Sequence, residues 1–375
     1  MYPKSAAERG LPENRVKSDS AREQVSGSER PGRPSQSELP RSPRLARYTM
    51  RLSDGHEVGV AVSGRGVPLV VVHGYSAEAF LYAQTLSRLV TRGFKVVAVD
   101  MAGHGSTQGL PMGGDTMAAY ADLLLRTVDE LGIRQAVFAG HSMGGRVVAE
   151  LAASVPDRVV ALVLLDAIVG DLWDGMVGFF RLAPWLMAPF GAVLVADTVS
   201  TVPALSDREQ AFKIARLAIP TYLGHALRPW RLVGPVLTIL RSSPSKPLLD
   251  RLAEEEVPVF VIHGERDLVV PLCTAKDAAR RTRGQLVVVR GATHSWLLKD
   301  PETLPAIVEH LLAGRLGEAV RSGLHAAGAE DLEVLESTFY RPGARILEMT
   351  PPSEFAPRPP RDPRYRWTVV QPSEL

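Results

Sequence analysis

Cysteine is almost absent from this sequence, which has only Cys273 among its 375 residues. No intrachain disulfide can form, so the fold cannot depend on an oxidising compartment. Long apolar runs are missing too. The chain does not begin with the apolar core that a secretory signal needs, and no uninterrupted run reaches the roughly 20 residues of a membrane span. We therefore expect a cytoplasmic protein without an integral membrane segment.

Neither sign of charge is in excess. Lys and Arg number 43, and Asp and Glu number 41, so no global field would gather nucleic acid or an anionic membrane. A small, neutral molecule fits this balance as the binding partner. With 45% hydrophobic residues, the chain can bury the core of one large α/β domain or of two ordinary ones. The sequence leaves open whether the protein is a monomer or a dimer.

The composition divides the chain into three parts. Residues 1–47 are rich in Ser, Pro, Gly and charge and show no apolar period, which predicts a disordered tail. From Tyr48, short β-branched runs alternate with amphipathic stretches, as in a parallel sheet with crossover helices. Several runs are apolar throughout, as strands covered on both faces must be. We expect an α/β domain over 48–314 and an extension over 315–375, partly helical and then proline-rich without regular structure.

One interval, between Asp166 and Val257, contains no strand-like run. Its apolar, aromatic and proline-punctuated sequence predicts a helical insertion over about residues 168–250. Such an insertion is either extra core or the roof of a binding cavity. We favour the roof, because insertions at the carboxyl ends of parallel strands lie over the usual ligand crevice. The residues expected to contact substrate are His73, Gly74, Trp173, Phe179, Phe180, Trp185 and Trp296.

The strongest local signal is the run Gly140–Gly144, which fits the pattern G-x-S-x-G. An apolar run precedes it and a helical pattern follows it, and this strand-to-helix context is what makes the motif a nucleophile elbow. So tight a turn forces the serine into a strained backbone conformation, and the flanking glycines leave room for neighbouring segments. Ser142 is therefore the candidate nucleophile.

A serine hydroxyl needs an adjacent base, usually a histidine that a carboxylate holds in one tautomer. His294 follows the last strand-like run and is the candidate base, whereas the side chain of His141 should point away from its neighbour Ser142 and be structural. Asp267 lies in the loop after the preceding run and is the candidate acid. Asp166, also at a strand end, is the alternative acid.

Acyl transfer also needs hydrogen-bond donors aimed at the oxyanion that develops. The backbone N–H of Met143, next to the nucleophile, is one candidate. The N–H of Tyr75 is the other, since it follows His73 and Gly74 at the end of an apolar run. The alternative interpretation of His73 and Gly74 is a tight strand exit without a catalytic part.

Five segments together resemble the α/β-hydrolase superfamily, in its serine-nucleophile, lidded branch of esterases, lipases and perhydrolases. They are HGY at His73–Tyr75, DMAGHGS at Asp100–Ser106, HSMGG at His141–Gly145, HGERDLVVP at His263–Pro271 and GATHS at Gly291–Ser295. The order of Ser, Asp and His along the chain agrees. The resemblance implies an α/β fold with a mostly parallel eight-stranded sheet flanked by helices, and a helical lid inserted after the sixth strand. It implies an active site beneath that lid, with no metal and no organic cofactor.

The resemblance also separates the possible reactions. Relatives that hydrolyse epoxides or haloalkanes carry Asp where this chain has Ser142, so those activities are not expected. We predict hydrolysis of a carboxylic ester, or a related acyl bond, in a small and fairly apolar substrate through an acyl-enzyme. Carbon–carbon bond hydrolysis and a cofactor-free perhydrolase (haloperoxidase-like) reaction are the alternatives among enzymes. A non-catalytic ligand-binding receptor on the same fold is the alternative from another class.

Overall fold

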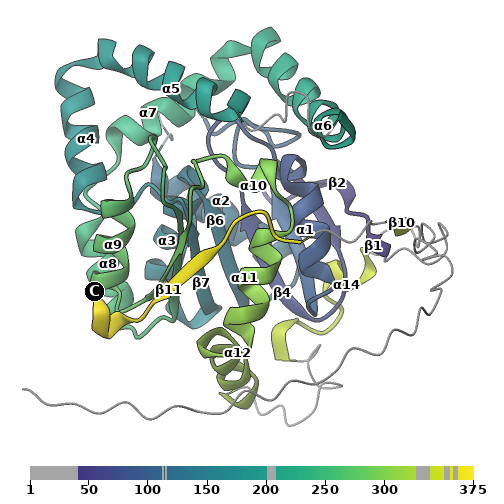
Figure 1. Cartoon of the computed structure of the whole chain (residues 1–375). Helices are drawn as coiled ribbons and strands as arrows, with labels where there is room; N and C mark the ends of the chain where they lie inside the picture. The colour runs from purple at the N-terminus through teal and green to yellow at the C-terminus, as the bar shows by residue number, and fades with distance from the viewer. Residues whose placement is uncertain are drawn as a thin grey trace, which may run out of the picture. The chain divides into compact units, whose positions relative to one another are not determined.

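A nine-stranded sheet forms the centre of the structure (Figure 1). The structure is a computed structural model. It describes residues 41–111, 114, 116–200, 208–326, 338–349, 355–357 and 362–375. Neighbouring strands of the sheet are parallel from β5 to β9, while β2, β3 and β11 pair antiparallel at the two edges. In order across the sheet, the strands are β11 (Trp367–Val370), β9 (Gln285–Val289), β8 (Val259–Gly264), β7 (Val159–Leu165), β6 (Ala136–His141), β4 (Val67–Val72), β5 (Phe94–Val99), β3 (Glu57–Ser63) and β2 (Ala46–Arg51).

The eight strands predicted from the apolar runs are all present as β2 to β9, which confirms the predicted fold class. The six strands from β4 to β9 are buried at every position, as expected for strands with helices on both faces. The parallel strands end at one edge of the sheet, so the loops that follow β4, β6, β8 and β9 lie near one another.

The ninth strand corrects one prediction. The proline-rich part of the C-terminal extension was expected to lack regular structure, yet β11 pairs with β9 from Trp367↔Val289 to Val370↔Leu286. The strand fits between Pro363 and Pro372, and its residues Trp, Thr, Val and Val favour extended backbone. Proline therefore limits the length of this edge strand without preventing it.

The N-terminal boundary also lies earlier than predicted. Most of the segment expected to be a disordered tail, residues 1–40, lies outside the described residues. Its last seven residues include β1 (Arg41–Pro43), which pairs with β10 (Phe355–Pro357), and the start of β2. β2 is an edge strand with a single buried position, so it lacks the apolar signal that would have revealed its first residues.

Helices cover both faces of the sheet. On one face α2 (Met117–Glu130), α3 (Met143–Ser154), α8 (Lys246–Glu254) and α9 (Leu272–Arg281) pack together. On the other face lie α1 (Ala83–Val90), α11 (Thr303–Leu312) and α12 (Arg315–Ala326) (Figure 1). Outside the insertion there are also two short helices, α10 (Trp296–Lys299) and α14 (Arg345–Glu348), and 3₁₀ turns at Ala79–Tyr82, Pro156–Arg158 and Pro372–Glu374.

Among the described residues between β7 and α8, the regular structure is entirely helical, with short irregular segments between the helices. It contains α4 (Asp171–Leu182), α5 (Met187–Ser200), α6 (Arg208–Leu227) and α7 (Val233–Arg241), with short 3₁₀ turns at Pro184–Leu186 and Pro229–Leu232. β7 is the sixth of the eight predicted strands. In Figure 1 these helices lie together beyond one end of the strands. We call residues 168–245 the insertion.

Among the described residues, no single helix has both the length and the apolar composition needed to cross a bilayer. One pair, Asp171–Leu182 and Pro184–Ser200, meets that test only when the two are taken together, and it is bent by 116° at the break.

Candidate active site

Ser142 occupies the single residue between β6 and α3. Its backbone has φ 53° and ψ −117°, a left-handed conformation that a non-glycine residue adopts only where the surroundings enforce it. A Cβ on Gly144 would lie 2.4 Å from the carbonyl oxygens of Val72 and His73, and one on Gly140 would lie 2.3 Å from that of Gly144. The motif glycines therefore allow the close approach of β4 and α3 that this turn needs. Met143 is the first residue of the 12-residue helix α3, so its N–H has no partner within the helix.

The side chains of Asp267 and His294 form a buried hydrogen-bonded pair. His294 Nδ1 lies 2.7 Å from Asp267 Oδ2, and the two side chains come from the loops after β9 and β8. The other carboxylate oxygen of Asp267 accepts the N–H groups of Val269 and Val270, each at 2.8 Å. These bonds fix the carboxylate and commit Nδ1 of His294 to it. Nε2 is then the ring nitrogen available to a hydroxyl proton.

The pair is electrostatically coupled. Burial lowers the pKa of His294, but the charge of Asp267 and its hydrogen bond oppose this, so the pKa of His294 lies above its ordinary value. Burial raises the pKa of Asp267, yet the charge and hydrogen bond of His294 outweigh it, and the pKa of Asp267 falls below its ordinary value. The carboxylate therefore stays ionised at neutral pH and stabilises a protonated imidazole.

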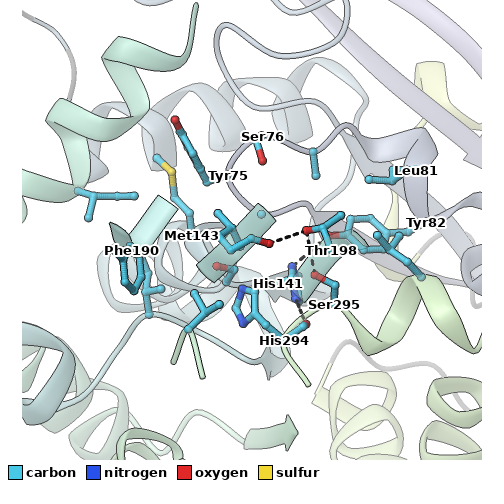
Figure 2. Close-up of a pocket in the computed structure, with 18 of the residues that line it drawn as sticks. Tyr75, Ser76, Leu81, Tyr82, His141, Met143, Phe190, Thr198, His294 and Ser295 are labelled. Atoms are coloured by element: carbon cyan, nitrogen blue, oxygen red, sulfur yellow. Dashed lines mark hydrogen bonds between the residues drawn. The ribbon is translucent and has the colours of Figure 1, made fainter. Parts of the chain in front are cut away.

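Ser142 and His294 line the same cavity, and Figure 2 shows His294 among the residues around it. It holds about 580 Å³ of empty space, including its opening to solvent. Both residues with candidate oxyanion N–H groups, Tyr75 and Met143, line it as well. The lining comes from the strand-end loops and from the insertion. The insertion contributes Ile168, Trp173, Phe190, Leu194, Thr198, Tyr222 and Ile239.

Of the residues expected to contact substrate, Gly74 and Trp173 line the cavity. His73, Phe179, Phe180, Trp185 and Trp296 do not lie among its lining residues. His73 is buried, and its Nε2 accepts the N–H of Met101 at 2.9 Å, as in the alternative interpretation of a strand exit. Phe179 and Trp185 are 57% and 71% exposed. Phe180 is buried against Phe190, with ring centroids 5.2 Å apart. The sequence shows that aromatic residues occur in these helices, but it does not show toward which side of the helix each side chain points.

Trp296 instead belongs to a network around Asp166. The Trp296 side chain is fully buried, and its Nε1 donates to Asp166 Oδ2 at 2.8 Å. Asp166 Oδ1 accepts the N–H of Gly264 at 2.7 Å. Burial, with the charge of Asp267, raises the pKa of Asp166 well above its ordinary value. Asp166 thus accepts hydrogen bonds from the core, and the carboxylate bonded to the His294 imidazole is that of Asp267.

Asp166, His263 and Asp267 bring three potential metal ligands within 4.8 Å of one another. Each carboxylate oxygen of the two aspartates already accepts at least one N–H hydrogen bond. His263 Nε2 lies 2.8 Å from the carbonyl oxygen of Val270, to which its N–H donates. The carboxylate oxygens thus already have protein hydrogen-bond donors. The arrangement fits a hydrogen-bond network that supports the Asp267–His294 pair.

His141 supports His294 from the opposite side. Its Nε2 is 3.1 Å from the backbone carbonyl of His294, and its Nδ1 is 3.0 Å from the hydroxyl of Tyr82 (Figure 2). Burial, with the charge of His294, lowers the pKa of His141 to about 3, so this ring is neutral at physiological pH. These contacts fit the structural role that the sequence analysis expected for His141.

Several lining residues were missed by the sequence analysis. Phe190, Leu194 and Thr198 of α5 project into the cavity one helical turn apart, a spacing visible in the sequence. Asp197, beside them, accepts backbone hydrogen bonds from the loop of His294. No sequence signal marked Asp197, because its partners lie 97 and 98 residues away.

The model of the Alpha/beta hydrolase family matches residues 69–306, which are 238 of the 375 residues. The chain belongs to the alpha/beta hydrolase family. This confirms the resemblance inferred from the motifs and makes the protein an enzyme of a hydrolase family.

Individual relatives of this alpha/beta hydrolase have different activities. A putative non-heme haloperoxidase of Mycobacterium phage D29 is 38% identical over 257 residues, covering 68% of this chain and 90% of the relative. A pimeloyl-[acyl-carrier protein] methyl ester esterase of Yersinia enterocolitica is 28% identical over 250 residues, and the match covers 64% of this chain and 91% of the relative. The crystal structure of the esterase RhEst1 from Rhodococcus sp. ECU1013 has a TM-score of 0.57 and 22% identity, covering 72% of this chain and 98% of that one, which shows the shared fold.

The change Trp296→Phe tests the assignment of Trp296 to the Asp166 network. Loss of the indole N–H leaves a buried carboxyl oxygen without its donor, which should lower the free energy of unfolding by about 1–3 kcal/mol, measured by urea denaturation. KM for an ester substrate should be nearly unchanged, whereas the control Trp173→Phe, in the cavity wall, should raise it. An increased KM with unchanged stability in Trp296→Phe would show instead that Trp296 contacts substrate.

Proposed function

We propose that this protein is a serine hydrolase that cleaves a carboxylic ester, or a related acyl bond, of a small and fairly apolar substrate. The observation that carries the proposal is the 2.7 Å hydrogen bond between Asp267 and His294, on a histidine that lines the same cavity as Ser142. A nucleophile and a base that line one cavity, with an acid hydrogen-bonded to the base, are the parts that acyl transfer requires. Ser142, His294 and Asp267 are assigned these three roles.

In the first step His294 Nε2 takes the Ser142 hydroxyl proton while Oγ forms a bond to the substrate carbonyl carbon. The carbonyl electron pair moves onto oxygen, where the N–H groups of Tyr75 and Met143 stabilise the negative charge. When the tetrahedral intermediate collapses, the bond to the leaving alcohol breaks and His294 gives the alcohol its proton. Asp267 stabilises the imidazolium throughout. Water, deprotonated by His294, then attacks the acyl-enzyme, and Ser142 regains its proton as the acid leaves.

The cavity wall supports an apolar substrate. Trp173, Phe190, Leu194 and Ile239 face it from the insertion, and apolar walls with a few polar groups are usual for small-molecule sites. In this proposal the insertion is a lid, because its residues complete the wall opposite the strand ends. The polar side chains of Thr198, Tyr222 and Ser295 also line the cavity and could orient the ester group.

Two observations bear on the alternative reactions. The 38% identity to a putative non-heme haloperoxidase favours a perhydrolase reaction as the second candidate, since that reaction needs the same acyl-enzyme with peroxide in place of water. Carbon–carbon bond hydrolysis would need a cationic group for a substrate carboxylate. The insertion offers Arg181, Arg216 and Arg228 as candidates for this cationic group. None of the three lies among the residues that line the cavity, and Arg181 instead donates to the carbonyl oxygens of Leu240 and Ser242.

Covalent labelling tests the nucleophile. A fluorophosphonate probe should label the wild-type protein and not Ser142→Ala, because the alanine has no oxygen to phosphonylate. Intact mass spectrometry and peptide mapping give the stoichiometry and the site. The matched control is Ser295→Ala, which removes a different hydroxyl from the same cavity and should still be labelled. Equal labelling of Ser142→Ala and wild type would contradict the proposal, and a protein that is labelled but inert toward every ester would favour the receptor alternative.

A second prediction concerns the acid. Asp267→Asn should lower kcat by about 10³- to 10⁴-fold, because the amide no longer holds the required tautomer of His294 or stabilises its protonated form. Asp166→Asn should retain most of the turnover, since the contacts of Asp166 do not include the imidazole. Steady-state kinetics on a nitrophenyl ester measure both, and the reverse ranking would assign the acid to Asp166.

The pH profile gives the same pair a second test. The base must be neutral to accept a proton, so kcat/KM should rise with pH through the pKa of His294, which lies above its ordinary value of 6.5. In Asp267→Asn the residual activity should show this limb at lower pH, because the charge that raises the pKa is gone. An unshifted limb would mean that Asp267 does not interact with the base.

A further inference from the structure

Asp197 connects the insertion to the loop of the proposed base. Its Oδ1 accepts the backbone N–H of His294 at 3.2 Å, and its Oδ2 accepts that of Ser295 at 2.8 Å. The neighbouring Thr198 Oγ1 lies 3.3 Å from Ser295 Oγ (Figure 2). Two consecutive residues of α5 thus hold two consecutive residues of the loop after β9.

The same helix forms part of the cavity wall. Phe190, Leu194 and Thr198 lie on the face of α5 that lines the cavity, and Asp197 is adjacent to that face. The position of α5 over the cavity and the bonds of Asp197 to the loop therefore depend on each other. If α5 moved away, the N–H groups of His294 and Ser295 would lose their acceptor while the cavity opened.

The charge of Asp197 also reaches the imidazole. Burial is the largest influence on the pKa of His294 and lowers it, whereas the charges of Asp267, Asp166 and Asp197 raise it. The pKa of Lys299 in α10 is lowered by burial and by the charge of Arg364, and the charge of Asp197 opposes this lowering. Asp197 is the only one of these carboxylates that the insertion supplies.

We propose that Asp197 is a positioning residue that couples the insertion to catalysis. With α5 in place, its carboxylate fixes the backbone of His294 and so the direction of the imidazole toward Ser142. The base is then fully assembled only when the insertion covers the cavity. This inference rests on the proposed function through the role given to His294.

Substitution of Asp197 tests the coupling. Asp197→Ala should lower kcat by about 10- to 100-fold, the size of effect that misplacement of a reacting group produces, with little change in KM. The acid limb of its pH profile should move to lower pH. Asp171→Asn is the matched control: it removes another carboxylate of the insertion, one paired with Arg281 of α9 and remote from His294, and it should leave kcat unchanged.

Measurements without turnover separate this inference from the proposed function. In wild type, NMR should show slow exchange of the His294 and Ser295 amides, and Asp197→Ala should accelerate both and lower the imidazole pKa. Unchanged exchange, pKa and kcat would overturn the inference while leaving the hydrolase proposal intact. An equal loss of kcat in Asp171→Asn would also overturn it, because the insertion would then act only through general stability. A wild type that neither reacts with the fluorophosphonate probe nor turns over would defeat the proposed function instead.

An independent observation concerns the outer surface of the insertion. Among the described residues, all but one of the exposed large hydrophobic side chains belong to it, the exception being Leu268. Those that do not line the cavity are Leu172, Phe179, Leu182, Trp185, Val193, Val195, Val199, Phe212, Ile219, Leu223, Leu227, Trp230 and Val233, whereas Tyr222 is partly exposed but also lines the cavity. An exposed apolar surface of this extent usually marks a binding surface.

The pattern along the helices shows that this surface is built into the sequence. In α6, Ile214, Thr221 and His225 are buried, while Phe212, Ile219, Leu223 and Leu227 are exposed on the opposite face. In α5 the face away from the cavity carries Val193, Val195 and Val199. No charged residue occurs from Leu182 to Ala196. A helix that is apolar all round normally has both faces covered.

Basic residues outnumber acidic ones around this surface. Residues 172–241 contain seven Lys and Arg and four Asp and Glu, although the whole chain is nearly neutral. The described acidic side chains there, Asp174 and Asp197, are half-buried and accept hydrogen bonds from Ser245 and from the His294 loop. Arg216 and Arg228 are exposed. A symmetric contact with a second copy would place this basic surface against itself, whereas an anionic lipid surface complements it.

We propose that the outer face of α5 and α6 docks on an anionic lipid surface. The helices lie in the interface, with apolar side chains among the acyl chains and arginines at the headgroups. The opening of the cavity to solvent and the docking face would then belong to the same end of the sheet.

Sedimentation of the full-length protein with vesicles tests this docking. The protein should bind phosphatidylcholine vesicles containing phosphatidylglycerol, bind vesicles of phosphatidylcholine alone at least about 10-fold more weakly, and dissociate at high salt. Val195→Asp and the pair Arg216→Gln, Arg228→Gln should each weaken binding. The matched control, Arg315→Gln with Arg321→Gln, removes the same charge from α12, below the other end of the sheet in Figure 1, and should not.

Three outcomes would overturn the docking proposal. The protein could fail to bind either vesicle, or the α12 control could lose binding as much as the insertion variants do. Light scattering could show a dimer that Val195→Asp dissociates, which would assign the surface to a second copy. Circular dichroism melting confirms that each variant is folded, and because these positions are exposed, their melting temperatures should match that of wild type.

Discussion

The backbone at Ser142 is the constraint on which the proposed site depends. The backbone hydrogen bonds of Ser142 hold this left-handed residue between a buried strand and a helix. Its N–H donates to the carbonyl oxygen of Leu165 at the end of β7, and its own carbonyl oxygen accepts the N–H of Ile168 as well as those of Gly145 and Arg146 in α3. The neighbouring glycines leave no space for a side chain. A residue fixed in this way cannot turn aside without separating β6 from β7. Its hydroxyl is thereby presented to the cavity at the start of α3, where the helix dipole and unpaired N–H groups favour negative charge.

Around this turn, each strand end supplies one part of the site. The loop after β4 brings Tyr75, the loop after β8 brings Asp267, and the loop after β9 brings His294. The loop after β7 brings Asp166, which joins β8 to α10 through Gly264 and Trp296. Buried polar groups are costly unless they are hydrogen-bonded. The network beneath the cavity is thus a scaffold for the Asp267–His294 pair, and the insertion adds Asp197 from above.

The sequence was sufficient for the features that rest on local patterns. Short strand-like runs identified the eight strands β2 to β9. The signal is strongest for β4 to β9, because burial on both faces leaves little place for polar residues. The G-x-S-x-G motif and the positions of Asp267 and His294 after their strands led to the three residues that the proposal uses.

Features that depend on tertiary packing could not be predicted in this way. Trp185 and Phe190 look alike in sequence, yet one is exposed and the other lines the cavity, because the turn at Pro184 sets the direction of α5. β11 was missed because its pairing partner is some 80 residues away.

The most direct test of the central claim, that Ser142 attacks a carbonyl within this cavity, is a crystal structure of the protein after reaction with a fluorophosphonate. We predict phosphorus bonded to Ser142 Oγ, its oxygen about 3 Å from the N–H groups of Tyr75 and Met143, and His294 Nε2 facing the adduct. Phosphorus on another residue, or a phosphonyl oxygen directed away from both N–H groups, would contradict the account.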